Sequence, residues 1–131
     1  NVITCYVTYH TRYLSALCGC AVKAGLGATA GMAYLLTGSM DIVEMAIQNM
    51  AGTITGLICD GGKEGCSLKL MASASMAVQS ALLATKGIRV PSDNGIVAEK
   101  VEDTIHNIGR GCQAMVMTDV EIVRIMADKA T

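Results

Sequence analysis

Apolar side chains recur every three or four residues along most of this chain, the spacing that places them on one face of an α-helix. Nowhere does the sequence sustain the alternation of apolar and polar residues that is typical of a half-buried strand. We therefore expect an all-α fold, a compact bundle of about six helices. The predicted helices span residues 2–17, 21–36, 40–58, 67–86, 97–108 and 119–129.

The predicted second helix, at 21–36, is rich in glycine and alanine and is expected at the centre of the bundle. Gly25, Gly27 and Gly31 are predicted on its inner side. The last two have the i, i+4 spacing that lets helices approach closely. This pattern predicts a central helix that packs tightly against its neighbours.

Several helix boundaries have local signals. Ser39 is a good N-cap for the third helix. Thr118 followed by Glu121 has the spacing of a capping box, which predicts the start of the last helix. Gly109 and Gly111 are expected to break the chain after the fifth helix.

Composition narrows the class of protein. A chain of 131 residues fits one domain, so we expect residues 1–131 to form a single helical domain. With 52% hydrophobic and 16% charged residues and a net charge of −1, the sequence gives no electrostatic footprint for nucleic acid. The longest weakly polar run, at 24–37, is about half of what spans a bilayer, so no membrane partner is expected.

The cellular compartment follows from the N-terminus and the cysteines. Residues 1–4 are neither basic nor followed by a cleavage pattern, so nothing resembles a signal peptide. The six cysteines lie in apolar helical patterns rather than in a small loop-rich scaffold, which favours reduced thiols. Both observations predict a cytoplasmic protein.

The densest group of reactive side chains is the segment 57–69, which holds two cysteines, two carboxylates, two lysines and three glycines. On one helix, Cys59 and Cys66 would lie roughly 10 Å apart along the axis, too far to share one metal or small cluster. Asp60-Gly61-Gly62 is expected to stop the helix, so that the two sulfurs fold back towards each other. Cys66 would then lie at a helix N-terminus, where partial positive charge favours a thiolate and an anion.

The same segment has a simpler interpretation. Most glycine-rich turns between helices have no chemical role, and free cysteines often behave as small hydrophobes in a core. The spacing also matches none of the common zinc or ferredoxin patterns. A second cysteine pair, Cys18-Gly19-Cys20, lies where Gly19 would loosen a helix and let one sulfur turn outwards.

At this point the sequence resembles a known family. The segments around Cys18-Gly19-Cys20 and from Ile58 to Lys69 closely resemble iron–sulfur L-cysteine desulfidases, a group allied to the alpha chain of iron–sulfur L-serine dehydratases. The likeness continues in order through residues 95–97, 101–110 and 118–126. It therefore covers nearly the whole chain and corresponds to the C-terminal, helical, cluster-binding fragment of a considerably longer enzyme.

The resemblance implies a 4Fe–4S cluster held by three cysteine thiolates. Two of these are Cys59 and Cys66, and the third is Cys18, with Cys20 as the alternative. The fourth iron is left for the substrate, as an open position is left in catalytic zinc sites. A preparation made in air is expected to lose such a cluster.

The resemblance also implies a lyase that acts in amino-acid catabolism. A β-elimination from L-cysteine or L-serine would give pyruvate, ammonia and sulfide or water. Lys63, Lys69 and Asp60 are the candidate substrate- or anion-binding residues. The proton-abstracting base is expected in the missing N-terminal part, so the present piece alone should be inactive.

Other interpretations stay open from the sequence. The chain could be a non-catalytic helical module that serves assembly and binds no cluster, or three thiolates could hold zinc. The sequence does not separate cysteine from serine as substrate, and it leaves a homo-oligomer open. His10 and His106 have no local catalytic partner, and Cys5 and Cys112 are interpreted as structural or incidental thiols.

Overall fold

The structure is a computed structural model and describes residues 1–129. It confirms the all-α class, with six α-helices and one π-helical segment, η1, among these residues. The elements are α1 (Val2–His10), η1 (Gly19–Lys23), α2 (Ala24–Thr37), α3 (Met40–Ile54), α4 (Gly65–Thr85), α5 (Val101–Ala114) and α6 (Val116–Asp128).

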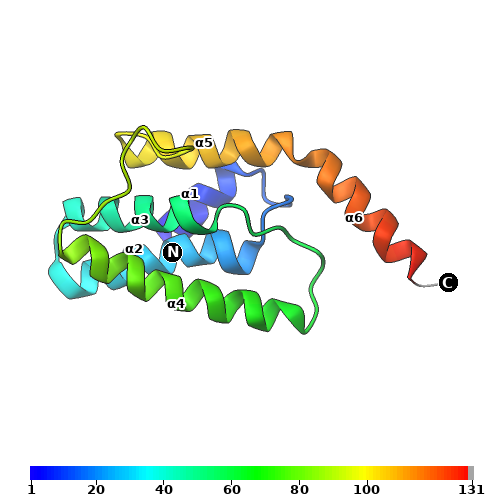
Figure 1. Cartoon of the computed structure of the whole chain (residues 1–131), viewed down its shortest axis with the longest axis horizontal. Coiled ribbons are helices and arrows are strands. Elements are labelled where there is room, and N and C mark those ends of the chain that lie inside the picture. Colours follow the sequence, from blue (N-terminus) through cyan, green and yellow to red (C-terminus); the bar gives the residue numbers. More distant parts are fainter. Residues whose placement is uncertain (130–131) are drawn as a thin grey trace.

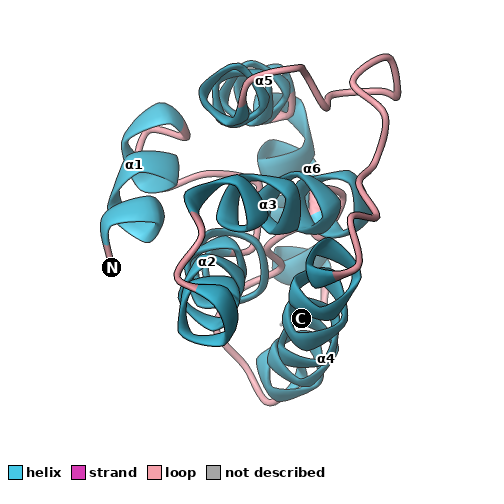
Figure 2. Ribbon diagram, turned by 90° about the vertical axis from the view of Figure 1, so that its left-hand side faces the viewer, coloured by secondary structure: helices cyan, strands magenta, loops and turns pink. Residues whose placement is uncertain are grey.

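Three helices form the body of the bundle. α2, α3 and α4 pack against one another, while α1 and α5 lie together and cover α2 and α3 (Figures 1 and 2). α6 continues from α5 but slopes away from the line of that helix, beyond the end of the bundle (Figure 1). α2 lies inside the bundle, as expected, and contacts α1, α3, α4 and η1.

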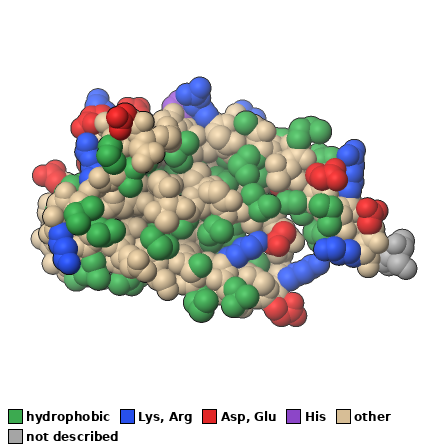
Figure 3. Space-filling view, viewed as in Figure 1, with side chains coloured by type: hydrophobic (Ala, Val, Ile, Leu, Met, Phe, Trp, Pro, Cys, Tyr) green, Lys and Arg blue, Asp and Glu red, His purple; other side chains and the backbone are tan. Residues whose placement is uncertain are grey.

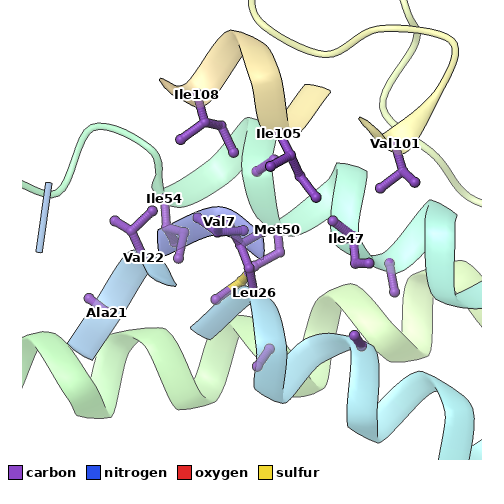
Figure 4. Packing of buried hydrophobic residues seen from close by; sticks show 14 of the residues in the cluster. Val7, Ala21, Val22, Leu26, Ile47, Met50, Ile54, Val101, Ile105 and Ile108 are labelled. Carbon is purple, nitrogen blue, oxygen red and sulfur yellow. The ribbon is translucent and has the colours of Figure 1, made fainter. Parts of the chain in front are cut away.

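The core is built from aliphatic and methionine side chains, since the chain has no Phe or Trp. Val7, Leu26 and Met50 meet at its centre, and Ile105 and Ile108 of α5 face them (Figure 4). The α4 side chains that are fully buried in this core are all small, which lets α4 approach α2 and α3 closely. They are Ala77, Ala81 and Ala84.

The inner face of α2 differs in part from the prediction. Gly25 is buried, and a Cβ there would lie 2.3 Å from Ser73 Oγ. A Cβ at Gly27 would lie 1.9 Å from Thr4 Oγ1, so both glycines permit close packing, as predicted. Gly31 is exposed with open space around it, so its placement on the inner face was wrong.

Two predicted helices end earlier than expected, and both ends matter for the site. α1 stops at His10, because Arg12 and Tyr13 adopt positive φ angles of 56° and 61°, which end a right-handed helix. α3 stops at Ile54 rather than at residue 58. The two freed segments meet in one antiparallel bridge between Leu17 and Ile58.

The last two helices begin and end differently from the prediction. α5 begins at Val101 and runs through Gly109 and Gly111 without a break. Gly109 instead serves close contact, since a Cβ there would lie 2.6 Å from the carbonyl oxygen of His10. α6 begins at Val116, so the predicted capping box at Thr118 does not mark its start. Ser39, by contrast, is the N-cap of α3 as expected, although its side chain makes no capping hydrogen bond.

The outer faces of α2 and α4 are apolar. They form a groove of about 320 Å³. The groove is lined by Met32, Leu35, Leu36, Val78, Ala81 and Leu82. Among residues 1–129, α4 is also the one helix long and apolar enough to cross a membrane, a property that core helices often share.

Close packing at Gly25 can be tested by adding one methyl group. Gly25→Ala should destabilise the fold by about 1–2 kcal/mol, because the clash with Ser73 and Met50 outweighs the better helix propensity of alanine. Gly31→Ala is the matched control in the same helix and should be neutral or stabilise by up to about 1 kcal/mol. Urea unfolding of both variants measures the difference. Equal stability of the two would contradict the packing described here.

Candidate functional site

A backbone bridge brings the two cysteine segments together. The Cys18 amide donates to the Leu57 carbonyl at 2.9 Å, and the Cys59 amide donates to the Ala16 carbonyl at 2.7 Å. Because side chains alternate along extended backbone, Cys18 and Cys59 share one face of this bridge as diagonal neighbours. Diagonal neighbours are typically about 7–8 Å apart. The bridge therefore brings the two cysteine-bearing segments together, although Cys59 directly follows the bridge residue Ile58 rather than lying at the predicted helix C-terminus.

Cys66 reaches the same region through a turn. Gly61 has a φ of +95°, a conformation that favours glycine, and it reverses the chain between Cys59 and Cys66. The Cys66 thiol then donates to the Gly61 carbonyl, with 3.4 Å between sulfur and oxygen. Cys66 lies in the first turn of α4, as predicted, where the helix end carries partial positive charge.

Lys69 ties the start of α4 to the bridge. Its ammonium donates to the Ile58 carbonyl at 3.0 Å and to the Asp60 carboxylate. The hydrogen bond to Asp60 is the main cause that raises the pKa of Lys69, and the nearby thiols of Cys18 and Cys66 raise it further. The same hydrogen bond is the main cause that lowers the pKa of Asp60.

The six cysteines are all free, and they differ in exposure. Cys18 is buried, Cys59 and Cys66 are half-buried, and Cys20 is exposed on η1. Cys20 therefore lies on the outside, whereas Cys18 lies at the bridge. Cys5 is exposed and Cys112 is buried.

The donors do not form a site for one bare ion. Within residues 1–129, no three His, Cys, Asp or Glu side chains are grouped to hold a single metal. A zinc ion needs every donor within about 2.0–2.3 Å of one atom, so this geometry gives the zinc interpretation no support. In a 4Fe–4S cluster each thiolate binds a different iron, so the sulfur donors lie farther apart than they do around a single metal ion.

Sequence reasoning missed one residue of this region, Lys23. It is only 5% exposed, and its ammonium donates to the Tyr13 carbonyl at 2.6 Å. Burial lowers its pKa, and the thiols of Cys112 and Cys59 oppose that effect. The available signal was its isolation, because Lys23 is the only charged side chain between Arg12 and Asp41.

A cavity of about 360 Å³ lies between α6 and the cysteine loop, the segment from Ile58 to Cys66. The loop contributes Ile58, Asp60 and Lys63, so one predicted anion-binding lysine does face an open space. α6 supplies the opposite wall with Ile122, Ile125 and Met126, together with Lys129, its C-cap residue. Basic and acidic side chains gather on this end of the molecule, where the start of α4 faces α6 (Figure 3). Lys69, in contrast, is engaged with Asp60.

Comparison with known proteins defines the family. The model of the serine dehydratase alpha chain matches residues 1–124. The chain belongs to the serine dehydratase alpha-chain family. This bears out the allied family named from the cysteine motifs.

Curated relatives of this serine dehydratase alpha-chain member carry names that state no activity. A UPF0597 protein of Desulfotalea psychrophila is 45% identical over 130 residues. Others from Clostridioides difficile and Clostridium botulinum are 46% identical over 129 residues and 50% identical over 113 residues. These alignments cover 98%, 98% and 86% of this chain but only 30%, 30% and 26% of the relatives. The chain thus spans less than a third of their length, and no solved structure matches it.

The turn at Gly61 should not tolerate a side chain. Gly61→Ala should destabilise the fold by about 1–2 kcal/mol, because an L-residue is strained at this positive φ. Gly62→Ala, with open space and no positive φ, should change stability by less than about 0.5 kcal/mol. Urea unfolding tests stability, and the alkylation rate of Cys66 reports whether the turn opens. A neutral Gly61→Ala variant would rule out this turn geometry.

The Asp60–Lys69 pair predicts a pH dependence. A carboxyl whose folded pKa is lowered stabilises the fold above its unfolded value, about 3.9, and this contribution is lost as pH falls through the folded value. In Lys69→Met, an NMR titration of Asp60 should move back up towards about 3.9. Lys63→Met should change it less, because Lys63 acts only through its charge and is the weakest cause. An unchanged Asp60 titration in Lys69→Met would refute the pairing.

Proposed function

We propose that this chain is the cluster-binding part of a 4Fe–4S-dependent lyase that performs β-elimination on L-cysteine or L-serine. Membership of the serine dehydratase alpha-chain family supports the lyase class. The observation that supports the proposal is the Leu17–Ile58 bridge, which joins the segments that carry Cys18 and Cys59, together with the turn that leads to Cys66.

The donor set fits a cluster in its chemistry. Cys18, Cys59 and Cys66 would hold it, since thiolates are the usual ligands of such clusters. Cys18 is favoured over Cys20 because it shares a face of the bridge with Cys59, whereas Cys20 is exposed. When bound, the cluster supplies a Lewis acid at the iron that no cysteine occupies.

The lysines and Asp60 have separate tasks in this proposal. Lys63 lines the cavity beside the loop and is exposed, so it can meet a substrate carboxylate there. Lys69 donates hydrogen bonds to Asp60 and Ile58, so it fixes the loop. Its positive charge also interacts electrostatically with Cys18 and Cys66. Asp60 then acts mainly by orienting Lys69.

The remaining part of a longer enzyme completes the proposal. The relatives are more than three times as long as the aligned segment, which leaves room for the α-proton base and for the rest of the substrate pocket. We expect this chain alone to be inactive, and we expect a cytoplasmic enzyme that can form a homo-oligomer. L-cysteine and L-serine both fit the chemistry, because they differ only in the leaving group.

One observation favours a second candidate function. The apolar groove between α2 and α4 is open to solvent, as in a helical module that serves assembly. In that case the chain would bind no cluster and its cysteines would be structural. Cluster reconstitution separates the two functions.

The decisive experiment is anaerobic reconstitution with iron and sulfide. The protein should take up a cluster with broad visible absorbance, and Cys18→Ser, Cys59→Ser and Cys66→Ser should each lose most of the bound iron. Cys5→Ser, which changes an exposed thiol on α1, is the matched control and should load like the parent.

Three outcomes would change the proposal. If the Cys18, Cys59 and Cys66 triple variant bound as much iron and sulfide as the parent, the cluster proposal would fail. Loss of iron in Cys20→Ser but not in Cys18→Ser would assign the third ligand to Cys20. A full-length relative, assayed anaerobically for pyruvate from each amino acid, would name the substrate, and no pyruvate from either would exclude the lyase.

A further inference from the structure

α4 turns its small side chains inwards and most of its large ones outwards. The buried residues of this helix are all serines and alanines: Ser73, Ala77, Ser80, Ala81 and Ala84. Six large apolar side chains of α4 are exposed, each with 39% to 65% of its surface accessible: Leu68, Leu70, Met71, Val78, Leu82 and Leu83. A surface helix ordinarily buries its large apolar side chains and exposes polar and charged ones. The outer face of α4 therefore has the composition of a buried surface.

The outer faces of α2 and α4 also lack charge. No Asp, Glu, Lys or Arg occurs in residues 24–40 or in residues 70–85. On α2, Leu35 is 86% exposed. α5 and α6 differ, because their exposed positions include charged residues: Glu102, Asp103, Arg110, Glu121 and Arg124. A helix that is apolar on all sides is normally buried, either in a larger protein or in a membrane.

The exposed faces of α2 and α4 meet in one groove. The two helices pack against each other on the side of the bundle away from α5 (Figure 2). The groove between them is lined at helical spacing from both sides, by Met32, Leu35 and Leu36 and by Val78, Ala81 and Leu82. Pockets for small molecules hold a few polar groups that orient the ligand, whereas all six lining residues here are apolar. A groove of this kind instead fits a helix that presents apolar side chains every three or four residues.

We propose that an apolar helix from the rest of a longer polypeptide, outside residues 1–131, lies in the groove between α2 and α4. The aligned segment is 30% of the Desulfotalea psychrophila relative, so more than two thirds of that protein lies outside it. A segment of the same polypeptide meets the groove at a high effective concentration. This inference rests on the proposal that the chain is part of a longer enzyme, but it does not depend on a cluster.

A membrane fits this surface less well. α4 is long and apolar enough to cross one, but Ser73 near its middle donates to the Ala21 carbonyl at 2.6 Å, and Lys69 donates to the Ile58 carbonyl of the cysteine loop. α2 has 14 residues, which gives a length of about 21 Å, shorter than the roughly 30 Å hydrocarbon core of a bilayer. Helices that lie on a membrane surface usually carry Lys or Arg, and residues 70–85 have none.

A second copy of this chain also fits poorly. In a two-fold dimer the same surface patch of each subunit meets its counterpart. A dimer centred on this groove would therefore place two concave surfaces opposite each other and leave both unfilled. A helix from elsewhere in the polypeptide has the convex shape that the groove lacks.

The first test is photo-crosslinking in the full-length protein, the polypeptide of which this chain is proposed to be a part. A benzophenone amino acid replaces Leu35 or Leu82 in the groove, or Val123 on the exposed face of α6 as the control. We expect positions 35 and 82 to crosslink to one apolar segment outside residues 1–131, several-fold more than position 123 does. Mixing copies labelled with different nitrogen isotopes shows whether each crosslink joins parts of one polypeptide or two copies.

The second test is thermal unfolding of the same full-length protein without a cluster. Leu35→Glu should lower the melting temperature by several degrees, because it places a charge in a covered apolar groove. Leu35→Met, which keeps the site apolar, and Val123→Glu, on a helix with charged neighbours, should each change it by no more than about 2 °C.

The outcomes separate this inference from its alternatives and from the proposed function. Crosslinks that join two copies overturn it in favour of a dimer. Crosslinks only to phospholipid, with vesicles of phosphatidylethanolamine and phosphatidylglycerol present, overturn it in favour of a membrane. The inference also fails if positions 35 and 82 give no protein product, or if Leu35→Glu unfolds at the same temperature as Val123→Glu. Because neither measurement needs iron, failure of cluster reconstitution overturns the cluster function and leaves this inference standing.

Discussion

Two backbone hydrogen bonds determine the geometry of the candidate site. The amides of Cys18 and Cys59 each donate across the bridge between Leu17 and Ile58, and this is the one strand-like pairing among the residues the structure describes. Without it, the segment after α1 and the segment after α3 would be independent loops. With it, one thiol from each segment lies on a common face, while buried Leu17 anchors the pair to the core.

The bridge is held in register from outside by α4. Lys69 donates to the carbonyl of Ile58, a bridge residue, and to the Asp60 carboxylate next to it. The helix that carries Cys66 is thereby fastened to the segment that carries Cys59. A charge-assisted contact of this kind does two things at once, because it fixes a distance and places positive charge beside thiols. The hydrogen bonds of Lys69 thus serve both the fold of the loop and the proposed binding of a cluster by its thiols.

The sequence and the structure agree where local signals decide the outcome. The periodicity around Leu26 and Met50 predicted helices that the structure contains. Asp60-Gly61-Gly62 correctly predicted a break in the chain before Cys66, although α3 already ends at Ile54. The bridge was not predictable, because a single pair of residues produces no alternating pattern and depends on contact between distant segments. The prediction that the first helix extends to Leu17 was wrong. Arg12 and Tyr13 adopt a left-handed backbone conformation, which is uncommon for non-glycine residues and cannot be predicted from their side chains.

Lys23 illustrates a different limit. A lysine in an apolar helix is ordinarily expected to extend its ammonium to water, and only the three-dimensional packing shows that this one does not. The same holds for Gly109, which looked like a helix breaker and instead lets α5 lie on the backbone of His10. In both cases the neighbour that matters is far away in the sequence.

The position of α6 has a consequence for how this family can diversify. None of its residues is buried, a single residue, Met115, separates it from α5, and it nevertheless supplies one wall of the cavity beside the cysteine loop. Residues that shape this cavity are therefore largely separate from residues that hold the bundle together. Ile122 and Lys129 can change during evolution without loosening the core, so the chemistry that the cavity admits can drift while the scaffold that presents the thiols stays the same.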